Sequence, residues 1–224
     1  MNNIECVIFD LDDTLYYEME YVRQAFMNVA VYLEDKCNIS SVKFYARMME
    51  LLENDGRGRI FNDIIDEYKI EESPNNLVSI YRATEPILEL YEDAKICIES
   101  LKKNNIKLAL ITDGCSQVQH NKIKGLGLEE IMDCIIVTDD YENAGKPSVI
   151  SYNMVMDMLQ IDEPSRCIYI GDNPRKDFVG AREVGMHTVR IVRSKGMFMS
   201  LKAEQGYDAD VIVKNLKELL HNNY

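Results

Sequence analysis

Val7-Ile8-Phe9-Asp10-Leu11-Asp12-Asp13-Thr14-Leu15 decides the fold, because here an apolar run ends in a cluster of acidic residues. The apolar residues between Ile4 and Phe9 predict a strand buried on both faces, which is typical of a parallel sheet. In open α/β sheets, ligands bind beyond the carboxyl ends of such strands. Asp10 and Asp12 should therefore face a ligand, one as a nucleophile and the other as a proton donor. Taken alone, the stretch also fits an acidic turn or a helix start.

Length and charge limit what this cluster can belong to. The chain has 224 residues, enough for one large domain or two small ones. Its 25 basic and 38 acidic residues give a net charge of −13, which disfavours nucleic acid or an anionic membrane as a partner. A small anionic substrate remains compatible, because a local pocket can be cationic. The sequence shows neither a signal peptide nor a membrane span, so we expect a soluble cytoplasmic protein.

The six cysteines contain no Cys-x-x-Cys pair, and this spacing predicts reduced, mostly buried thiols. Cys115 is the cysteine that lies nearest to a candidate ligand loop. An oxidation-sensitive role is one interpretation of Cys115, and an inert buried thiol is the other.

A helical segment follows the acidic cluster. Apolar residues recur at helical spacing from residue 16 to residue 86, and four helices are expected there. Pro74-Asn75-Asn76 is expected to break the pattern before the last of them, a short helix from about Leu77 to Arg82. Aromatic and methionine side chains along these helices fit a core better than a ligand site. We therefore expect an all-helical insert at 16–86, beside an α/β core formed by residues 1–15 and 87–224.

The remainder of the chain alternates between helix and strand. Expected helices are Asp93–Lys103, Gln117–Lys124, Val149–Leu159 and Arg175–Val184. Expected strands are Ile106–Ile111, Cys134–Val137, Cys167–Ile170, Thr188–Val192 and Val211–Val213. This alternation predicts a doubly wound, Rossmann-like parallel sheet with helices on both faces.

Polar residues follow the second expected strand of the core. Thr112 can donate its hydroxyl, and the backbone amide of Gly114 can approach an oxyanion closely. The next helix, which Ser116 is expected to cap, would point its amino terminus toward the same anion. A plain turn is the alternative interpretation of these residues.

Two later loops carry further charged residues. Lys146 lies in Gly145-Lys146-Pro147-Ser148 just before a helix, where it can supply a cation, although lysines beside proline are usually solvated. Asp172 terminates the apolar strand in Ile168-Tyr169-Ile170-Gly171-Asp172, and Asp177, five residues further along, is expected on the opening turn of the next helix. A helix cap with an acid that complements the helix dipole is the alternative.

Electrostatics connects these loops. Two carboxylates about 4 Å apart repel by ~4 kcal/mol at an effective dielectric near 20, so a cluster of aspartates needs positive charge. A divalent cation together with Lys146 would provide it. Oxygen ligands beside a phosphate favour Mg²⁺. Zinc is disfavoured, because the three histidines form no ligand-spaced set with cysteine.

Four short motifs occur in order along the chain, each near the end of an expected strand. They are Asp-x-Asp-x-Thr at 10–14, Thr-Asp-Gly at 112–114, Lys-Pro at 146–147 and Gly-Asp-x-x-x-x-Asp at 171–177. Together the motifs resemble the haloacid dehalogenase superfamily of phosphohydrolases. The resemblance covers the whole α/β core, and the helical insert is similar to the small cap of the first type in that family.

The resemblance implies roles for the motif residues. Asp10 is the nucleophile that forms an aspartyl-phosphate, and Asp12 protonates the leaving oxygen and then activates water. The transferring phosphoryl group would be bound by Thr112, Asp113, Gly114 and Lys146. The family also implies Mg²⁺, held by the Asp10 carboxylate, the Asp12 backbone carbonyl and Asp172.

Two supporting residues and a cap loop complete the expected site. Asp177 would orient Lys146 or a metal-bound water, and Asn173 belongs to the same motif. Arg57 and Arg59 lie in a loop between cap helices, where we expect contact with a carboxylate, a sugar or a second anionic group of the substrate. An exposed solubilising loop is the alternative. The expected substrate is a small soluble phosphorylated metabolite, such as a sugar phosphate or a nucleoside monophosphate.

Other functions share parts of this pattern. A dehalogenase of the same family needs neither Asp12 nor Asp172. A phosphosugar mutase shares the whole residue set, and would isomerise its substrate without net release of phosphate. A non-enzymatic receiver module carries an acidic pair, a threonine and a lysine, but its phosphorylated aspartate follows the third strand. A catalytically silent Mg²⁺-binding scaffold is the remaining alternative.

Overall fold

The computed structural model describes residues 3–220, which divide into two compact units. One unit joins the chain up to Glu18 with the chain from Leu88 onward, and the other is Met19–Ile87. The sequence analysis predicted these domain boundaries after Leu15 and after Pro86. Each unit has its own hydrophobic core.

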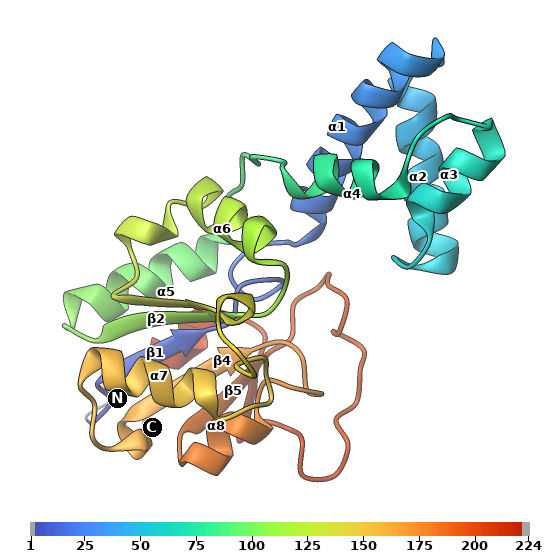
Figure 1. The fold of residues 1–224 in the computed structure, drawn as a ribbon. Coiled ribbons are helices and arrows are strands. Elements are labelled where there is room, and N and C mark those ends of the chain that lie inside the picture. The colour runs from blue at the N-terminus through green and yellow to red at the C-terminus, as the bar shows by residue number, and fades with distance from the viewer. Residues whose placement is uncertain (1–2, 221–224) are drawn as a thin grey trace. The chain divides into compact units, whose positions relative to one another are not determined.

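The first unit is built on a six-stranded sheet in which every neighbouring pair is parallel (Figure 1). The strands are β1 (Cys6–Phe9), β2 (Lys107–Thr112), β3 (Cys134–Val137), β4 (Cys167–Gly171), β5 (His187–Ile191) and β6 (Val211–Val213). Their order in the sheet is β3-β2-β1-β4-β5-β6, which confirms the predicted doubly wound α/β fold. Phe9 is in register with Leu110 of β2 and Ile170 of β4, so these three strands end at nearly the same level.

Helices flank this sheet. They are α5 (Glu92–Lys103), α6 (Ser116–Gly125), α7 (Ile150–Leu159) and α8 (Val179–Val184). Short 3₁₀ helices are η1 (Leu128–Glu130), η2 (Thr138–Asp140), η3 (Pro164–Arg166) and η4 (Leu216–Leu220). Alternate strand residues such as Cys6 and Ile8 form one core cluster with Val155 of α7 and Ala181 of α8. All six cysteines are free, and Cys115 is half-buried rather than buried.

Two predicted features of these helices are wrong. Residues 174–178 form turns, and α8 begins only at Val179, because the Asp177 carboxylate folds back to accept a hydrogen bond from the Asn173 N–H. Ser116 is the first residue of α6 and not its cap. Its N–H donates at 2.9 Å to the Asp139 carboxylate of η2, which follows β3.

The second unit contains α1 (Met19–Cys37), α2 (Ser41–Asp55), α3 (Ile60–Tyr68) and α4 (Pro74–Arg82). Buried apolar residues from all four helices form its core, with edge-to-face ring contacts such as Phe44–Tyr68. The prediction broke the chain at Pro74 and began the helix at Leu77. In fact α4 begins at Pro74, because proline fits the first helical position and the Ser73 hydroxyl accepts a hydrogen bond from the Asn75 N–H. Across residues 3–220, no helix has the length and apolarity to cross a membrane.

Candidate active site

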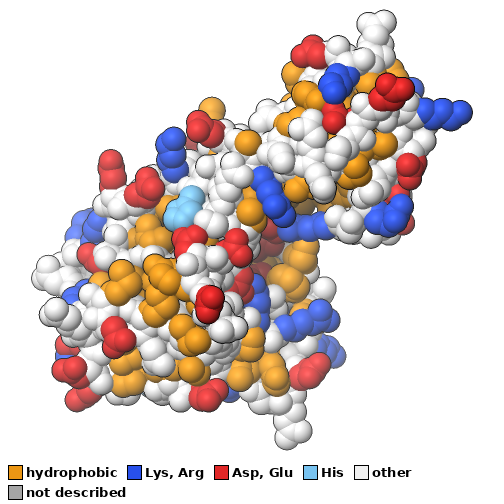
Figure 2. Space-filling model, in the orientation of Figure 1, with side chains coloured by type: hydrophobic (Ala, Val, Ile, Leu, Met, Phe, Trp, Pro, Cys, Tyr) orange, Lys and Arg blue, Asp and Glu red, His pale blue; other side chains and the backbone are white. Residues whose placement is uncertain are grey.

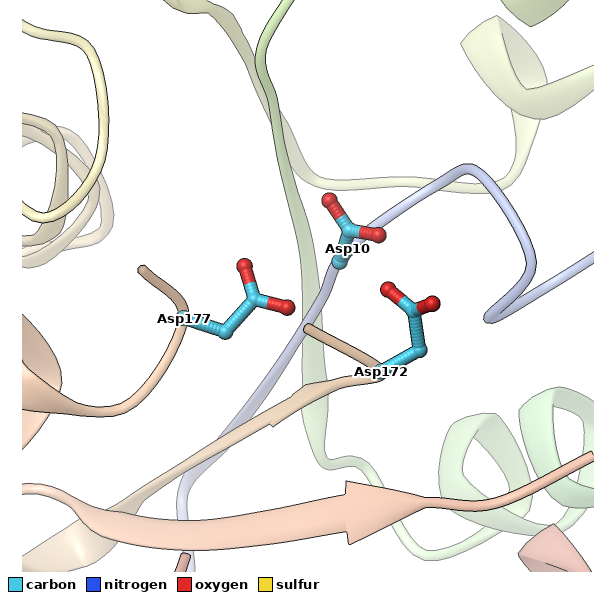
Figure 3. Close-up of side chains that lie close together, drawn as sticks. All are labelled: Asp10, Asp172 and Asp177. Carbon is cyan, nitrogen blue, oxygen red and sulfur yellow. The ribbon is translucent and has the colours of Figure 1, made fainter. Parts of the chain in front are cut away.

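Three buried aspartates converge at the carboxyl edge of the sheet (Figure 3). Asp10 follows β1, Asp172 follows β4, and Asp177 lies in the turns after β4. One carboxylate oxygen from each lies within 4.8 Å of the other two. The sheet explains this convergence, because β1 and β4 are paired neighbours whose ends are in register.

Lys146 supplies the positive charge beside these carboxylates. Its Nζ lies 2.5 Å from Asp10 Oδ1 and 2.8 Å from Asp177 Oδ1, and it donates to the Tyr169 hydroxyl at 2.9 Å. Burial alone would lower the pKa of Lys146, but Asp10 and Asp177 outweigh it and hold that pKa well above its usual range. The ammonium group is therefore charged.

One ammonium does not balance three carboxylates. Burial, reinforced by the neighbouring Asp10 and Asp177, raises the pKa of Asp172 to about 9. Burial likewise raises the pKa of Asp10 to about 7, although Lys146 opposes the shift. Asp172 Oδ2 is also buried without a hydrogen-bond partner in the described part of the chain. An uncompensated, all-oxygen donor set of this kind fits a hard divalent cation such as Mg²⁺.

Asp177 is held in place by its own motif. Its Oδ2 accepts the Asn173 N–H at 2.8 Å, while its Oδ1 faces Lys146. A Cβ atom at position 171 would lie 2.4 Å from Asp177 Oδ2, so only glycine leaves room for this carboxylate. The motif thus fixes Asp177 against Lys146, and the Asn173 contact comes from its backbone.

Asp12 is not part of the three-carboxylate cluster. Its Oδ1 accepts hydrogen bonds from Tyr16 at 2.6 Å and Lys122 at 2.8 Å, and its Oδ2 accepts from Gln119 at 3.0 Å and Lys122 at 2.9 Å. Burial alone would raise the pKa of Asp12, but Lys122, Tyr16 and Gln119 together lower it. The Asp12 carboxylate is therefore held as an anion by α6.

The loop after β2 places its predicted residues unequally. Thr112 is buried, and its Oγ1 accepts a hydrogen bond from Gln119 at 2.5 Å. Gly114 has a φ of 134°, which a residue with a side chain rarely adopts. The Asp113 carboxylate accepts hydrogen bonds from the Thr138 hydroxyl, the Lys146 N–H and the Lys176 ammonium. A phosphate contact from Asp113 must therefore come from its backbone.

Arg57 and Arg59 belong to the helical unit and line one pocket within it. The pocket has a volume of about 280 Å³, and Phe26, Phe61 and Tyr81 are among its lining residues. The Arg59 Nε lies 3.5 Å from Asp63 Oδ1, and the Arg59 side chain is 71% exposed. Within this unit the two arginines and the aromatic rings thus share one pocket.

Sequence reasoning missed several side chains of the site. They are Tyr16, Gln119, Lys122, Tyr169 and Lys176. The available signal was spacing, because Gln119 and Lys122 lie three residues apart on the helix that follows Thr-Asp-Gly and so share one face.

Buried carboxylates, a lysine ammonium and hydroxyl groups meet at the carboxyl edge of a parallel sheet, which is where α/β enzymes bind their ligands. The family of this protein follows from the sequence match. A family model described as haloacid dehalogenase-like hydrolase matches residues 7–191, and the chain belongs to that family. The predicted family is therefore confirmed, and with it the predicted enzyme class, a hydrolase whose relatives are phosphatases.

Three similar proteins illustrate this relationship. A glyceraldehyde 3-phosphate phosphatase of Methanocaldococcus jannaschii is 28% identical, over 96% of this chain and 99% of that protein. The pyrophosphatase PpaX of Bacillus cereus is 26% identical, over 97% and 95% of the two chains. The crystal structure of a HAD phosphatase from Thermococcus onnurineus has a TM-score of 0.63 and 26% identity, and the match covers 97% of each chain.

Proposed function

We propose that this chain is a Mg²⁺-dependent phosphomonoesterase that hydrolyses a small phosphorylated metabolite through an aspartyl-phosphate on Asp10. The observation that carries the proposal is the convergence of Asp10 with Lys146 and Asp172, three residues far apart in sequence. Family membership and phosphatase relatives support the reaction class.

The proposed reaction has two halves. In the first, an Asp10 carboxylate oxygen bonds to phosphorus while the ester P–O bond breaks. Asp12, an anion in the free site, takes up a proton with the incoming phosphate ester and gives it to the leaving oxygen. In the second, Asp12 takes a proton from water, which attacks phosphorus and releases inorganic phosphate from Asp10. Lys146 and Thr112 bind the phosphoryl oxygens throughout.

The metal would be held by Asp10 and Asp172, together with the Asp12 backbone carbonyl. When bound, Mg²⁺ supplies positive charge that offsets the carboxylates and the phosphate. Uncatalysed hydrolysis of phosphate monoesters is slow enough to need acceleration of up to ~10²¹-fold, about 29 kcal/mol, whereas one acid or base supplies only ~10²- to 10⁴-fold. The proposed site therefore combines covalent catalysis, proton transfer and fixed charge.

A direct test uses purified protein with p-nitrophenyl phosphate, in MgCl₂ and in excess EDTA. We expect turnover in Mg²⁺, strong loss in EDTA, and at least ~10³-fold loss in Asp10→Asn, because that variant lacks the nucleophile. Asp157→Asn, an exposed aspartate on α7, is the matched control and should retain full activity. Full activity of Asp10→Asn would refute the proposal.

The substrate is proposed from the relatives and from the pocket around Arg57 and Arg59. A screening panel should contain glyceraldehyde 3-phosphate, pyrophosphate, sugar phosphates and nucleoside monophosphates. Acidic and basic side chains are interspersed on the face seen in Figure 2, and the net charge of −13 fits a small ligand better than a nucleic acid. Release of phosphate also separates a phosphatase from a phosphosugar mutase.

Replacing both arginines with alanine tests their proposed contact with the substrate. We expect KM for the best panel substrate to rise about tenfold or more, while kcat/KM for p-nitrophenyl phosphate stays within about twofold. The small aryl phosphate serves as the internal control, because it has no second anionic group. Unchanged kinetics on both compounds would remove the arginines from the substrate site.

A further inference from the structure

Helix α6 buries two polar side chains on one face. Gln119 is 1% exposed and Lys122 is 3% exposed, although lysine and glutamine are usually solvated. They lie three residues apart, so they project side by side from the helix. Burial at this level needs hydrogen-bond or charge partners, and both side chains find them in the first and second motifs.

The first partner is the Asp12 carboxylate. Each of its oxygens accepts two hydrogen bonds: Oδ1 from Tyr16 and Lys122, and Oδ2 from Gln119 and Lys122. Lys122 therefore bridges both oxygens, while Tyr16 and Gln119 each bind one. Rotation of the carboxylate would break at least two of these bonds, so the four contacts fix its orientation.

The second partner is the Thr112 hydroxyl. The two N–H groups on Gln119 Nε2 point to Asp12 Oδ2 at 3.0 Å and to Thr112 Oγ1 at 2.5 Å. An ionised Asp12 can only accept, so the nitrogen of the Gln119 amide must face it. Thr112 Oγ1 then accepts from Gln119, and its own O–H proton is directed to another acceptor, such as a phosphoryl oxygen.

We propose that Gln119 and Lys122 are positioning residues of the enzyme, with separable effects. Lys122 helps to orient the proton donor Asp12. Gln119 helps to orient both Asp12 and the phosphate-binding hydroxyl of Thr112. This inference rests on the proposed phosphomonoesterase function, because it assigns partners to the acid and to the phosphate loop of that reaction.

The test for Lys122 uses leaving groups of different basicity. The parameter kcat/KM covers the steps up to formation of the phosphoenzyme, in which Asp12 protonates the leaving oxygen. An alkyl phosphate needs that proton, and p-nitrophenyl phosphate barely needs it. Lys122→Met should therefore lose about 10- to 100-fold in kcat/KM on an alkyl phosphate such as glycerol 2-phosphate, and less than about threefold on p-nitrophenyl phosphate. Lys122→Arg, which keeps the charge, should recover most of the loss.

The test for Gln119 adds inhibition by inorganic phosphate. Gln119→Leu should lose about tenfold or more on both substrates, and the competitive inhibition constant of inorganic phosphate should rise by about tenfold. In Lys122→Met that inhibition constant should change by less than about threefold. Lys124→Met and Gln117→Leu replace exposed residues of the same helix and are the matched controls.

The outcomes separate this inference from the proposed function. A parent protein without hydrolysis of any phosphate ester would refute both. If the parent is active but Lys122→Met loses the same factor in kcat/KM on both substrates, or loses no activity, the positioning role of Lys122 is refuted. The proposed phosphatase function is then unaffected. If Lys122→Met fails to melt cooperatively, Lys122→Gln, which keeps one donor, carries the same comparison.

Discussion

Replacing Asp172 with asparagine should make the metal-free protein more stable, although it should destroy the proposed metal site. Asp172 Oδ2 is buried without a hydrogen-bond partner among residues 3–220. Asp10 and Asp177 place carboxylate oxygens within 4.8 Å of an oxygen of Asp172. At that distance two unit charges repel by ~3.5 kcal/mol at an effective dielectric of 20.

The size of the gain follows from protonation. Burial, reinforced by Asp10 and Asp177, raises the pKa of Asp172 from 3.8 to about 9. At pH 7 the folded protein therefore keeps a proton on Asp172 that the unfolded chain releases. This pH lies 3.2 units above the unfolded pKa of 3.8, and each unit costs ~1.36 kcal/mol. The raised pKa therefore destabilises the folded state by at most ~4 kcal/mol. Burial of the asparagine amide costs free energy and so reduces this gain. We expect Asp172→Asn to raise the free energy of unfolding by about 2 kcal/mol, or Tm by about 4 to 8 °C.

Thermal denaturation in EDTA measures this difference. A carboxyl whose pKa is raised by folding does not affect the free energy of unfolding when the pH is below its unfolded pKa. Above that pH it destabilises the folded protein, and the effect grows until the pH reaches the folded pKa. The gap between Asp172→Asn and the parent should therefore be small near pH 4 and widen between pH 5 and pH 8. Saturating MgCl₂ should stabilise the parent and leave the variant unchanged. An Asp172→Asn protein that melts below the parent in EDTA at pH 7 would refute the charge imbalance.

Three further substitutions test other parts of the molecule. Gly171→Ala places a Cβ 2.4 Å from Asp177 Oδ2, so we expect ~1–3 kcal/mol of destabilisation in urea unfolding and at least tenfold lower kcat. Phe44→Ala empties a fully buried position in the helical unit and should cost ~3–5 kcal/mol in the same measurement. Hydrogen bonds from Lys36, Tyr32 and the Ser73 N–H lower the pKa of Glu72 to about 2, so Glu72→Gln should lower Tm at pH 7. That difference should shrink as pH falls through 4.5 toward 2, and a constant difference would contradict it.

The sheet was predictable because its strands are short apolar runs that end in punctuating residues. Cys134–Val137 and Val211–Val213 occur with the expected bounds. Helix starts were less predictable, since they depend on contacts that are not local in sequence. Val179 begins α8 because Asp177 is drawn into the site, and the Ser116 N–H is bound by Asp139 from another loop.

Much of the candidate site follows from the same logic. Residues that end neighbouring parallel strands must come together, so Asp10 and Asp172 could be paired before their distance was known. Lys146 could be assigned as the counter-charge because a cluster of buried carboxylates requires a cation. The contribution of Tyr169, which binds Lys146 from inside β4, carried no such signal, because a tyrosine in a strand usually packs against apolar neighbours.

The partners of Asp12 show where the sequence signal ends. A lysine and a glutamine on a helix are ordinarily surface residues, and neither type by itself predicts burial. Lys122 is buried because Asp12 neutralises it, and that pairing depends on the rotation of α6 about its own axis relative to the end of β1. If α6 were rotated by about 100° around its axis, the angle between successive helical residues, a neighbour of Lys122 would face Asp12 instead. The motifs at the strand ends would be unchanged. The acid can therefore be read from the first motif, whereas the group that orients it is set by packing.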